Sequence, residues 1–197
     1  FAAQTNAGKI VVDASLAKAS TIVGSTGVDS ITGGSGADSI TGGTGADTID
    51  GGAGADTIVY ALTANLFNTS TKVVVDSISG GDGIDTLLVG DTTANFTIAK
   101  DYVWTGFSDV ETIKAAAMGS SYTASISLDV SAATSGITKV DLSDITKTSG
   151  TVIDVSEYTS ATDTTLIGPS ATTSAANITG GAGIDTITAA GGGGSIT

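Results

Sequence analysis

The chain has 197 residues and a formal net charge of −13, from 20 acidic and 7 basic residues, and it contains neither cysteine nor histidine. This charge balance argues against nucleic acid as a partner. The two missing residue types exclude disulfides, thiol nucleophiles and zinc–thiolate sites, and they remove the commonest general base. No run of 18 apolar residues occurs, so we expect no membrane-spanning segment.

Four nine-residue units follow one another from Gly24 to Val59 and read GSTGVDSIT, GGSGADSIT, GGTGADTID and GGAGADTIV. Each unit has aspartate at its sixth position and isoleucine at its eighth. Glycine permits tight turns with positive φ, and one large apolar residue between two small polar residues gives a short strand with a single inward side chain. The period therefore predicts an all-β solenoid, and residues 1–23 are expected to form one or more strands that lead into it.

The acidic position makes calcium the expected ligand, because calcium takes six to eight oxygens and each loop offers carbonyls and a carboxylate. Ordering one residue costs roughly 1–2 kcal/mol, whereas burying the isoleucine of a unit returns about 1.5–3 kcal/mol. A nine-residue unit is therefore not stable on apolar burial alone. Stacked carboxylates also repel one another until a cation neutralises them, so we expect folding to be coupled to calcium. The alternative for each aspartate is a solvated cap of a glycine-rich turn.

Two further units occur downstream, GGDGIDTLL at 80–88 and GGAGIDTIT at 180–188. Counting nine residues back from Gly80 gives TKVVVDSIS, which keeps Asp76 at position six and Ile78 at position eight. The phase therefore predicts a roll over 24–88 with an insertion at about 60–70. The same count places three isoleucines at position eight of units that lack the aspartate: Ile22, Ile178 and Ile196. Residues 171–197 are accordingly expected to begin a further repeat stretch that is truncated.

Residues 89–170 are predicted to form an irregular β-solenoid, because short segments of alternating β-branched and polar residues recur there. LDVS at 128, VDLS at 140 and IDVS at 153 are spaced 12 and 13 residues apart. No Asn-Gly or Asp-Gly hairpin turn falls between them, which favours parallel rungs. Their aspartates are expected to form a solvated row on the outer strand face rather than a catalytic cluster: Asp129, Asp141 and Asp154.

An aromatic group occurs in the segment DYVWTGF, where Tyr102, Trp104 and Phe107 lie close in sequence. Such a group can stack on a sugar or can close an exposed side of a solenoid. We favour the second interpretation, since solenoids need their apolar ends and sides covered.

The units fit the pattern G-G-x-G-x-D-x-U-x, with U a large aliphatic residue, and the chain thereby resembles the RTX (repeats-in-toxin) calcium-binding proteins. The units at 33–41, 42–50 and 51–59 fit every fixed position, and the first unit departs only at Ser25. The resemblance implies a parallel β-roll in which two successive units make one turn. It also implies that each calcium ion lies between loops two units apart, bound by position-six carboxylates and loop carbonyls.

This arrangement pairs Asp29 with Asp47 on one side of the roll and Asp38 with Asp56 on the other. If the roll resumes in register after the insertion, Asp47 also faces Asp76 and Asp56 also faces Asp85. The metal ligands that the resemblance implies are the following: Asp29, Asp38, Asp47, Asp56, Asp76, Asp82, Asp85, Asp185, Gly27, Gly34, Gly36, Gly43, Gly45, Gly52, Gly54, Gly81 and Gly83. Asp185 has the weaker support, because Gly194 stands where the next carboxylate belongs.

The unit at 80–88 is followed by an aromatic-x-x-aliphatic-Glu-Thr-aliphatic sequence at Phe107–Ile113. This combination is similar to the RTX-type surface-layer (S-layer) proteins of Gram-negative bacteria. The resemblance implies a non-enzymatic, secreted cell-surface module, exported by type I secretion, that self-associates into a two-dimensional lattice. Cell-surface polysaccharide is a further candidate partner.

Two alternatives remain open, an RTX adhesin or biofilm fragment and the calcium-binding module of a secreted RTX protease or lipase. Neither an HExxH helix nor a GxSxG elbow occurs in the sequence, which argues against the catalytic part of such an enzyme.

Overall fold

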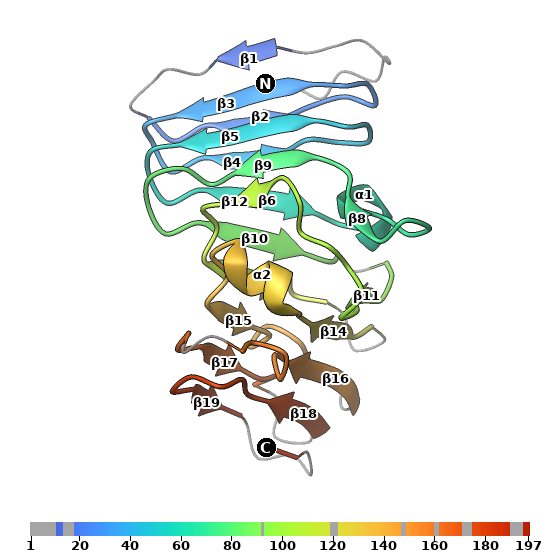
Figure 1. Cartoon of the computed structure of the whole chain (residues 1–197). Helices are drawn as coiled ribbons and strands as arrows, with labels where there is room; N and C mark the ends of the chain where they lie inside the picture. The colour runs from blue at the N-terminus through green and yellow to red at the C-terminus, as the bar shows by residue number, and fades with distance from the viewer. Residues whose placement is uncertain are drawn as a thin grey trace.

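The computed structural model describes residues 11–13, 18–91, 93–118, 122–146, 149–159, 162–170, 175–189 and 195–197. Short strands stack along one axis into an elongated parallel β-solenoid, with the N-terminal strands at one end and the C-terminal strands at the other (Figure 1). The predicted all-β class and parallel solenoid are confirmed. No helix in these ranges is long and apolar enough to cross a membrane.

Three parallel sheets form the walls of the solenoid. The five-stranded sheet contains β1 (Val11–Asp13), β3 (Ser30–Gly34), β5 (Thr48–Gly52), β9 (Ser77–Ser79) and β12 (Phe107–Ser108). The eight-stranded sheet contains β2 (Thr21–Val23), β4 (Ser39–Thr41), β6 (Thr57–Tyr60), β10 (Thr86–Val89), β13 (Thr112–Ala115), β15 (Lys139–Asp141), β17 (Thr165–Ile167) and β19 (Thr186–Thr188). The four-stranded sheet contains β11 (Phe96–Ile98), β14 (Ala124–Ser127), β16 (Ser149–Asp154) and β18 (Ala175–Thr179).

The eighth position of the repeat forms the core of the roll. Ile22 pairs with Ile40, Ile40 with Ile58, and Ile58 with Leu87, and each of these side chains is at most 1% exposed. Below them the same ladder continues through Ile113, Val140 and Leu166. Ile178, placed in phase by the sequence, lies in β18 opposite Ile153 and bridges to Ile196. One large apolar side chain per strand is thus enough to build a continuous core.

The roll resumes in register after the insertion. Ile49 of β5 pairs with Ile78 of β9, and β6 pairs with β10. Both strands of one turn therefore stack on both strands of the next turn. The inserted segment folds outside the stack as α1 (Thr63–Leu66) and the antiparallel pair β7 (Phe67–Asn68) and β8 (Val73–Val74). It projects from one edge of the roll (Figure 1).

The aromatic residues of the later loop cover this insertion from below. The Phe67 ring lies 4.5 Å from that of Tyr102 and 5.1 Å from that of Trp104, and Trp104 lies 4.9 Å from Phe107, all edge to face. Each of the four is at most 6% exposed. Edge-to-face pairs contribute about 0.5–1.5 kcal/mol beyond their burial. The group therefore closes the side of the solenoid, and buried rings offer no face to a sugar.

The predicted row of solvated aspartates in the later rungs is wrong in detail. Each carboxylate accepts the amide two residues on: Asp129 from Ser131 at 2.9 Å, Asp141 from Ser143 and Asp154 from Ser156 at 3.0 Å each. These are Asx turns, in which the side chain mimics a backbone turn. Asp129 also caps the short helix α2 (Val130–Thr134), and Asp141 is only 9% exposed.

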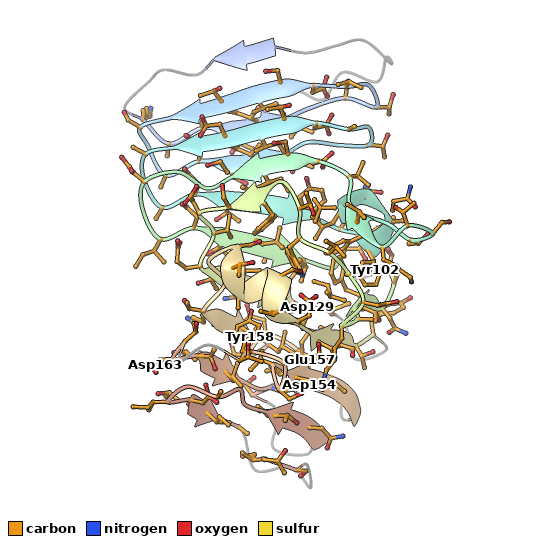
Figure 2. The ribbon with its side chains drawn as sticks, viewed as in Figure 1. Tyr102, Asp129, Asp154, Glu157, Tyr158 and Asp163 are labelled. Carbon is orange, nitrogen blue, oxygen red and sulfur yellow. The ribbon has the colours of Figure 1, made fainter. Side chains whose placement is uncertain are left out.

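The parallel direction of these rungs is as predicted, because β14 pairs with β16 and β15 with β17. Asp129, Asp154 and Glu157 lie in the C-terminal half of the stack, apart from the glycine-rich loops of the first repeats (Figure 2). Asp129, Asp141 and Asp154 therefore stabilise turns of the later rungs and are not part of the candidate site.

Candidate metal centre

The glycine-rich loops stack along the two edges of the roll. The first loop column consists of loops 33–38, 51–56 and 80–85, which lead from the five-stranded to the eight-stranded sheet. The second loop column consists of loops 24–29 and 42–47 and the segment 71–76, which lead back. The insertion lies on the edge of the second column (Figure 1).

The aspartate at position six of every one of these loops is buried. The exposed fractions are 1% for Asp29, 2% for Asp38, 2% for Asp47, 1% for Asp56, 4% for Asp76 and 0% for Asp85. Carboxylates are almost never fully buried unless they are paired. The solvated-cap alternative for these six residues is therefore wrong.

One oxygen of four of these carboxylates accepts a hydrogen bond from the aspartate amide of the preceding layer. In the first column the Asp38 amide donates to Oδ1 of Asp56 and the Asp56 amide to Oδ1 of Asp85, both at 2.7 Å. In the second column the Asp29 amide donates to Oδ1 of Asp47 at 2.9 Å, and the Asp47 amide donates to Oδ1 of Asp76 at 2.7 Å. The structure thus brings together all four aspartate pairs that the sequence phase predicts.

The other oxygen is left open in four of the loops. Oδ2 of Asp38, Asp47, Asp56 and Asp85 is buried and has no hydrogen-bond partner among the described residues. A buried charge without a partner costs several kcal/mol unless a counter-ion or metal compensates it. The open oxygens are therefore the positions at which a cation is needed.

Carbonyl oxygens of the next layer lie beside the three open oxygens of the first column, those of Asp38, Asp56 and Asp85. A Cβ built on Gly51 would lie 2.3 Å from the Gly80 carbonyl oxygen and 2.5 Å from Oδ2 of Asp56. One built on Gly33 would lie 2.4 Å from the Gly51 carbonyl oxygen and 2.7 Å from Oδ2 of Asp38. Only glycine leaves this space free for a ligand. Our prediction missed these first-position glycines, although every complete unit begins with one.

The predicted glycines at positions two and four have a mixed role. The carbonyls of Gly34 and Gly52 accept ladder hydrogen bonds, from the amides of Ala53 at 2.7 Å and Asp82 at 2.8 Å. The carbonyls of Gly27, Gly36 and Gly54 face the following layer within 2.7 Å of a Cβ built there. The remaining four have positive φ, which the turn requires: Gly43, Gly45, Gly81 and Gly83.

Two aspartates of the second column differ from the others because hydroxyl groups reach them. The hydroxyl and amide of Ser25, the residue that replaces the second glycine of the first unit, both donate to Asp29. The hydroxyl of Tyr60 donates to Oδ2 of Asp76. A Cβ built on Gly42 would meet Oδ2 of Asp47 at 2.7 Å, but the three nearest atoms include no carbonyl of the next layer. The layer between Asp47 and Asp76 therefore lacks the oxygen lining of the first column.

The other two predicted aspartates also stand apart. The side chain of Asp82 is exposed, because its backbone continues the ladder through a bridge to Ala53 and turns the side chain to solvent. Asp185 accepts from the Gly181 amide at 2.9 Å and from the Thr164 hydroxyl at 2.5 Å. Both differ from the buried, open carboxylates of the first column.

Replacing Tyr60 tests whether its hydroxyl compensates Asp76. Tyr60→Phe leaves an oxygen of a buried carboxylate without its donor, so we expect the free energy of unfolding in saturating calcium to fall by about 1–3 kcal/mol. The number of bound ions should stay the same, because this layer lacks the carbonyl lining. Denaturant unfolding and ion counting measure the two effects. Tyr122→Phe, at a residue only partly buried against the core, is the control, and equal unfolding curves for wild type and Tyr60→Phe would contradict the expectation.

The protonation of these carboxylates is shifted by their surroundings. Burial, and to a smaller extent the neighbouring carboxylates, raise the pKa of Asp47, Asp56 and Asp85. Burial raises the pKa of Asp76 to about 6. In all four cases the carboxylate of the folded chain without metal binds a proton more tightly than it does in the unfolded chain.

These shifts predict an unusual pH dependence in calcium-free buffer. A folded-state pKa above the unfolded value of about 3.9 stabilises the fold fully below that value, and the stabilisation is lost as pH rises through the folded pKa. Circular dichroism in calcium-stripped buffer should therefore show more β-structure near pH 4 than near pH 7. β-structure that increases with pH over this window would contradict the expectation.

The opposite shifts elsewhere in the chain act at lower pH. Against the effect of burial, hydrogen bonds from Ser143 and Ser156 lower the pKa of Asp141 and Asp154. Their stabilisation is present above the unfolded pKa and is lost only as pH falls through the lowered values. The change in stability between about pH 4 and 7 therefore measures the buried aspartates of the loop columns.

The donor set fits calcium. No three acidic, histidine or cysteine side chains converge on one point in the described part of the chain, so an ion would be bound by carboxylates from successive layers together with carbonyls. A hard cation with six to eight oxygen ligands in flexible geometry matches this set. Transition metals that prefer nitrogen or sulfur do not.

Comparison with known families gives an independent result. Residues 23–58 and 171–193 match the model of the RTX calcium-binding nonapeptide repeat (4 copies). The chain contains RTX calcium-binding repeats, folded as a β-roll. The first matched segment contains the loops of Asp29, Asp38, Asp47 and Asp56, whereas the loop of Asp85 lies outside it and is placed in the column by the sequence period and by geometry. No curated protein and no solved structure matches the chain significantly.

Proposed function

We propose that this chain is a structural calcium-binding module of a secreted bacterial cell-surface protein, and specifically a lattice subunit of a Gram-negative S-layer. The observation that carries the proposal is the set of buried, open carboxylate oxygens facing loop carbonyls in the RTX repeats. Calcium bound there neutralises the negative charge of these oxygens, which have no other partner among the described residues. The role is mechanical, because the ion joins one layer of the roll to the next.

The calcium gradient across the cell envelope makes this coupling useful. At the low calcium concentration of the cytosol the carboxylates repel one another, and the repeats stay unfolded for export through a type I system. Extracellular calcium modules bind at roughly 10⁻⁴–10⁻³ M, so the millimolar concentration outside the cell is enough to fold the roll. The net charge of −13 adds to the repulsion in the unloaded chain.

The outer face of the five-stranded sheet supports contact between subunits. One outward row consists of the small polar residues Ser30, Thr48 and Ser77, and the other contains Thr32, Asp50 and Ser79. The strands of this sheet stack directly above one another (Figure 1), and their outward side chains are short. Such a face can pack against another copy without a large loss of side-chain entropy.

Electron microscopy of the purified chain tests the lattice. We expect ordered two-dimensional sheets in millimolar calcium, and none in chelator or in magnesium, which demands a stricter octahedral geometry. A calcium-folded monomer that binds cell-surface polysaccharide would favour the adhesin alternative. A calcium-folded monomer without either property would overturn the lattice role and leave only the calcium module.

A further inference from the structure

The first loop column continues one layer beyond the repeats. We propose that Asp85, the backbone carbonyl of Asp109 and Glu111 form an additional calcium site, in which Asp85 belongs to the last unit of the roll and the other two residues belong to no nonapeptide unit. The inference rests on the proposed calcium binding of the repeats and adds one site to it. Its evidence is the equivalence between the loop 109–111 and the glycine-rich loops above it.

Glu111 occupies the place of the next position-six aspartate. The Asp85 amide donates to Oε2 of Glu111 at 2.8 Å, just as the Asp56 amide donates to Oδ1 of Asp85 at 2.7 Å. Strand register agrees, because Thr86, which follows Asp85, pairs with Thr112, which follows Glu111. The longer side chain of glutamate compensates for a loop that is shorter than those of the repeats.

Asp109 supplies the carbonyl that a first-position glycine supplies elsewhere. A Cβ built on Gly80 would lie 1.7 Å from the Asp109 carbonyl oxygen and 2.6 Å from Oδ2 of Asp85. The corresponding distances from Gly51 are 2.3 Å to the Gly80 carbonyl oxygen and 2.5 Å to Oδ2 of Asp56. Asp109 has a φ of 54°, a left-handed conformation that aspartate adopts more readily than most residues. The first-position glycines have no positive φ, so the shorter loop turns at the same residue that supplies the carbonyl.

The open oxygen that such a site needs is present. Oδ2 of Asp85 is buried, with the side chain 0% exposed, and has no hydrogen-bond partner among the described residues. Burial, followed by the negative charges of Glu111 and Asp109, raises the pKa of Asp85. A divalent cation between the two layers removes this repulsion. With two carboxylates, a carbonyl and water as ligands, calcium fits better than a nitrogen-preferring metal.

The second column has no such extension, so the additional site is confined to the first column. There the hydroxyl of Tyr60 already donates to Oδ2 of Asp76, so the corresponding oxygen is not open. The two edges of the roll thus differ in length, and the column of open oxygens reaches further on the edge away from the insertion.

Counting ions in the whole chain tests the site. In Glu111→Gln the amide oxygen still accepts from the Asp85 amide, so the fold should persist, as circular dichroism in saturating calcium can verify. We expect native mass spectrometry and calorimetry to show one calcium fewer than in wild type. Glu157→Gln is the matched control. Glu157 is the other glutamate of the chain, is 52% exposed and lies 3.6 Å from Lys100, and its substitution should leave the count unchanged.

The outcomes separate this inference from the proposed function. Equal counts and affinities for wild type and Glu111→Gln would overturn the additional site and leave calcium binding by the repeats intact. Wild type that binds no calcium would overturn the proposed function itself. If Glu111→Gln does not fold, anomalous diffraction from calcium-loaded wild-type crystals decides: a peak between Asp85 and Glu111 supports the site, and its absence overturns it.

Discussion

Removal of calcium is expected to abolish most of the ordered β-structure of residues 24–88. Without the ion, the open oxygens of Asp38, Asp47, Asp56 and Asp85 are buried without compensation, at a cost of several kcal/mol for each charge. Each roll unit buries one isoleucine, worth about 1.5–3 kcal/mol, which does not offset that cost together with chain ordering. The stack of apolar side chains is therefore not stable by itself at neutral pH.

Circular dichroism during a calcium titration measures this transition. We expect a cooperative gain of β-structure with a midpoint between roughly 10⁻⁴ and 10⁻³ M. Occupation of a single site at one hundred times its Kd adds about 2.7 kcal/mol of stability, so several sites together suffice to fold the roll. Magnesium at the same concentration is the control, and full structure in chelator at neutral pH would contradict the expectation.

Substitution of one buried aspartate should have effects of opposite sign with and without calcium. Asp56 lies in the middle of the first column, 1% exposed, with Asp38 above it and Asp85 below it. Asp56→Asn keeps an oxygen that accepts from the Asp38 amide but removes one negative charge. Calcium affinity depends on the charge of the ligand set, so we expect the calcium midpoint of folding to rise on the order of tenfold or more.

In calcium-stripped buffer the same variant should be more stable than wild type. Burial and the charges of Asp85 and Asp38 disfavour the Asp56 carboxylate, and a neutral amide removes that penalty. The calcium titration measures the first effect, and the β-structure that circular dichroism detects in calcium-stripped buffer measures the second. Asp101→Asn, at an exposed loop residue, should change neither. A variant that is destabilised to the same extent in both buffers would indicate a role in packing rather than in ion binding.

The periodic part of the fold could be predicted because each unit repeats the same local rule. Isoleucine at position eight appears as the core ladder, and Asp76 lies beneath Asp47 across the insertion, where counting back from Gly80 puts it. A parallel solenoid conserves the phase between layers, so an insertion that leaves the stack does not change the register below it. The sequence period therefore carries long-range information.

The non-periodic contacts could not be predicted in this way. Tyr60 reaches Asp76 only because the inserted segment folds outward and returns, and Phe67 meets Trp104 for the same reason. Glu111 lacks the glycines that mark a repeat, and its position in the column follows from the pairing of β10 with β13. These contacts depend on tertiary geometry, for which a local pattern contains no signal.

Anomalous diffraction from calcium-loaded crystals locates the ions against named residues. We expect calcium peaks between Asp29 and Asp47 in the second column and between Asp38 and Asp56 in the first, each beside a carbonyl of the following layer. Calcium only at exposed carboxylates such as Asp82, with none between these buried pairs, would contradict this expectation.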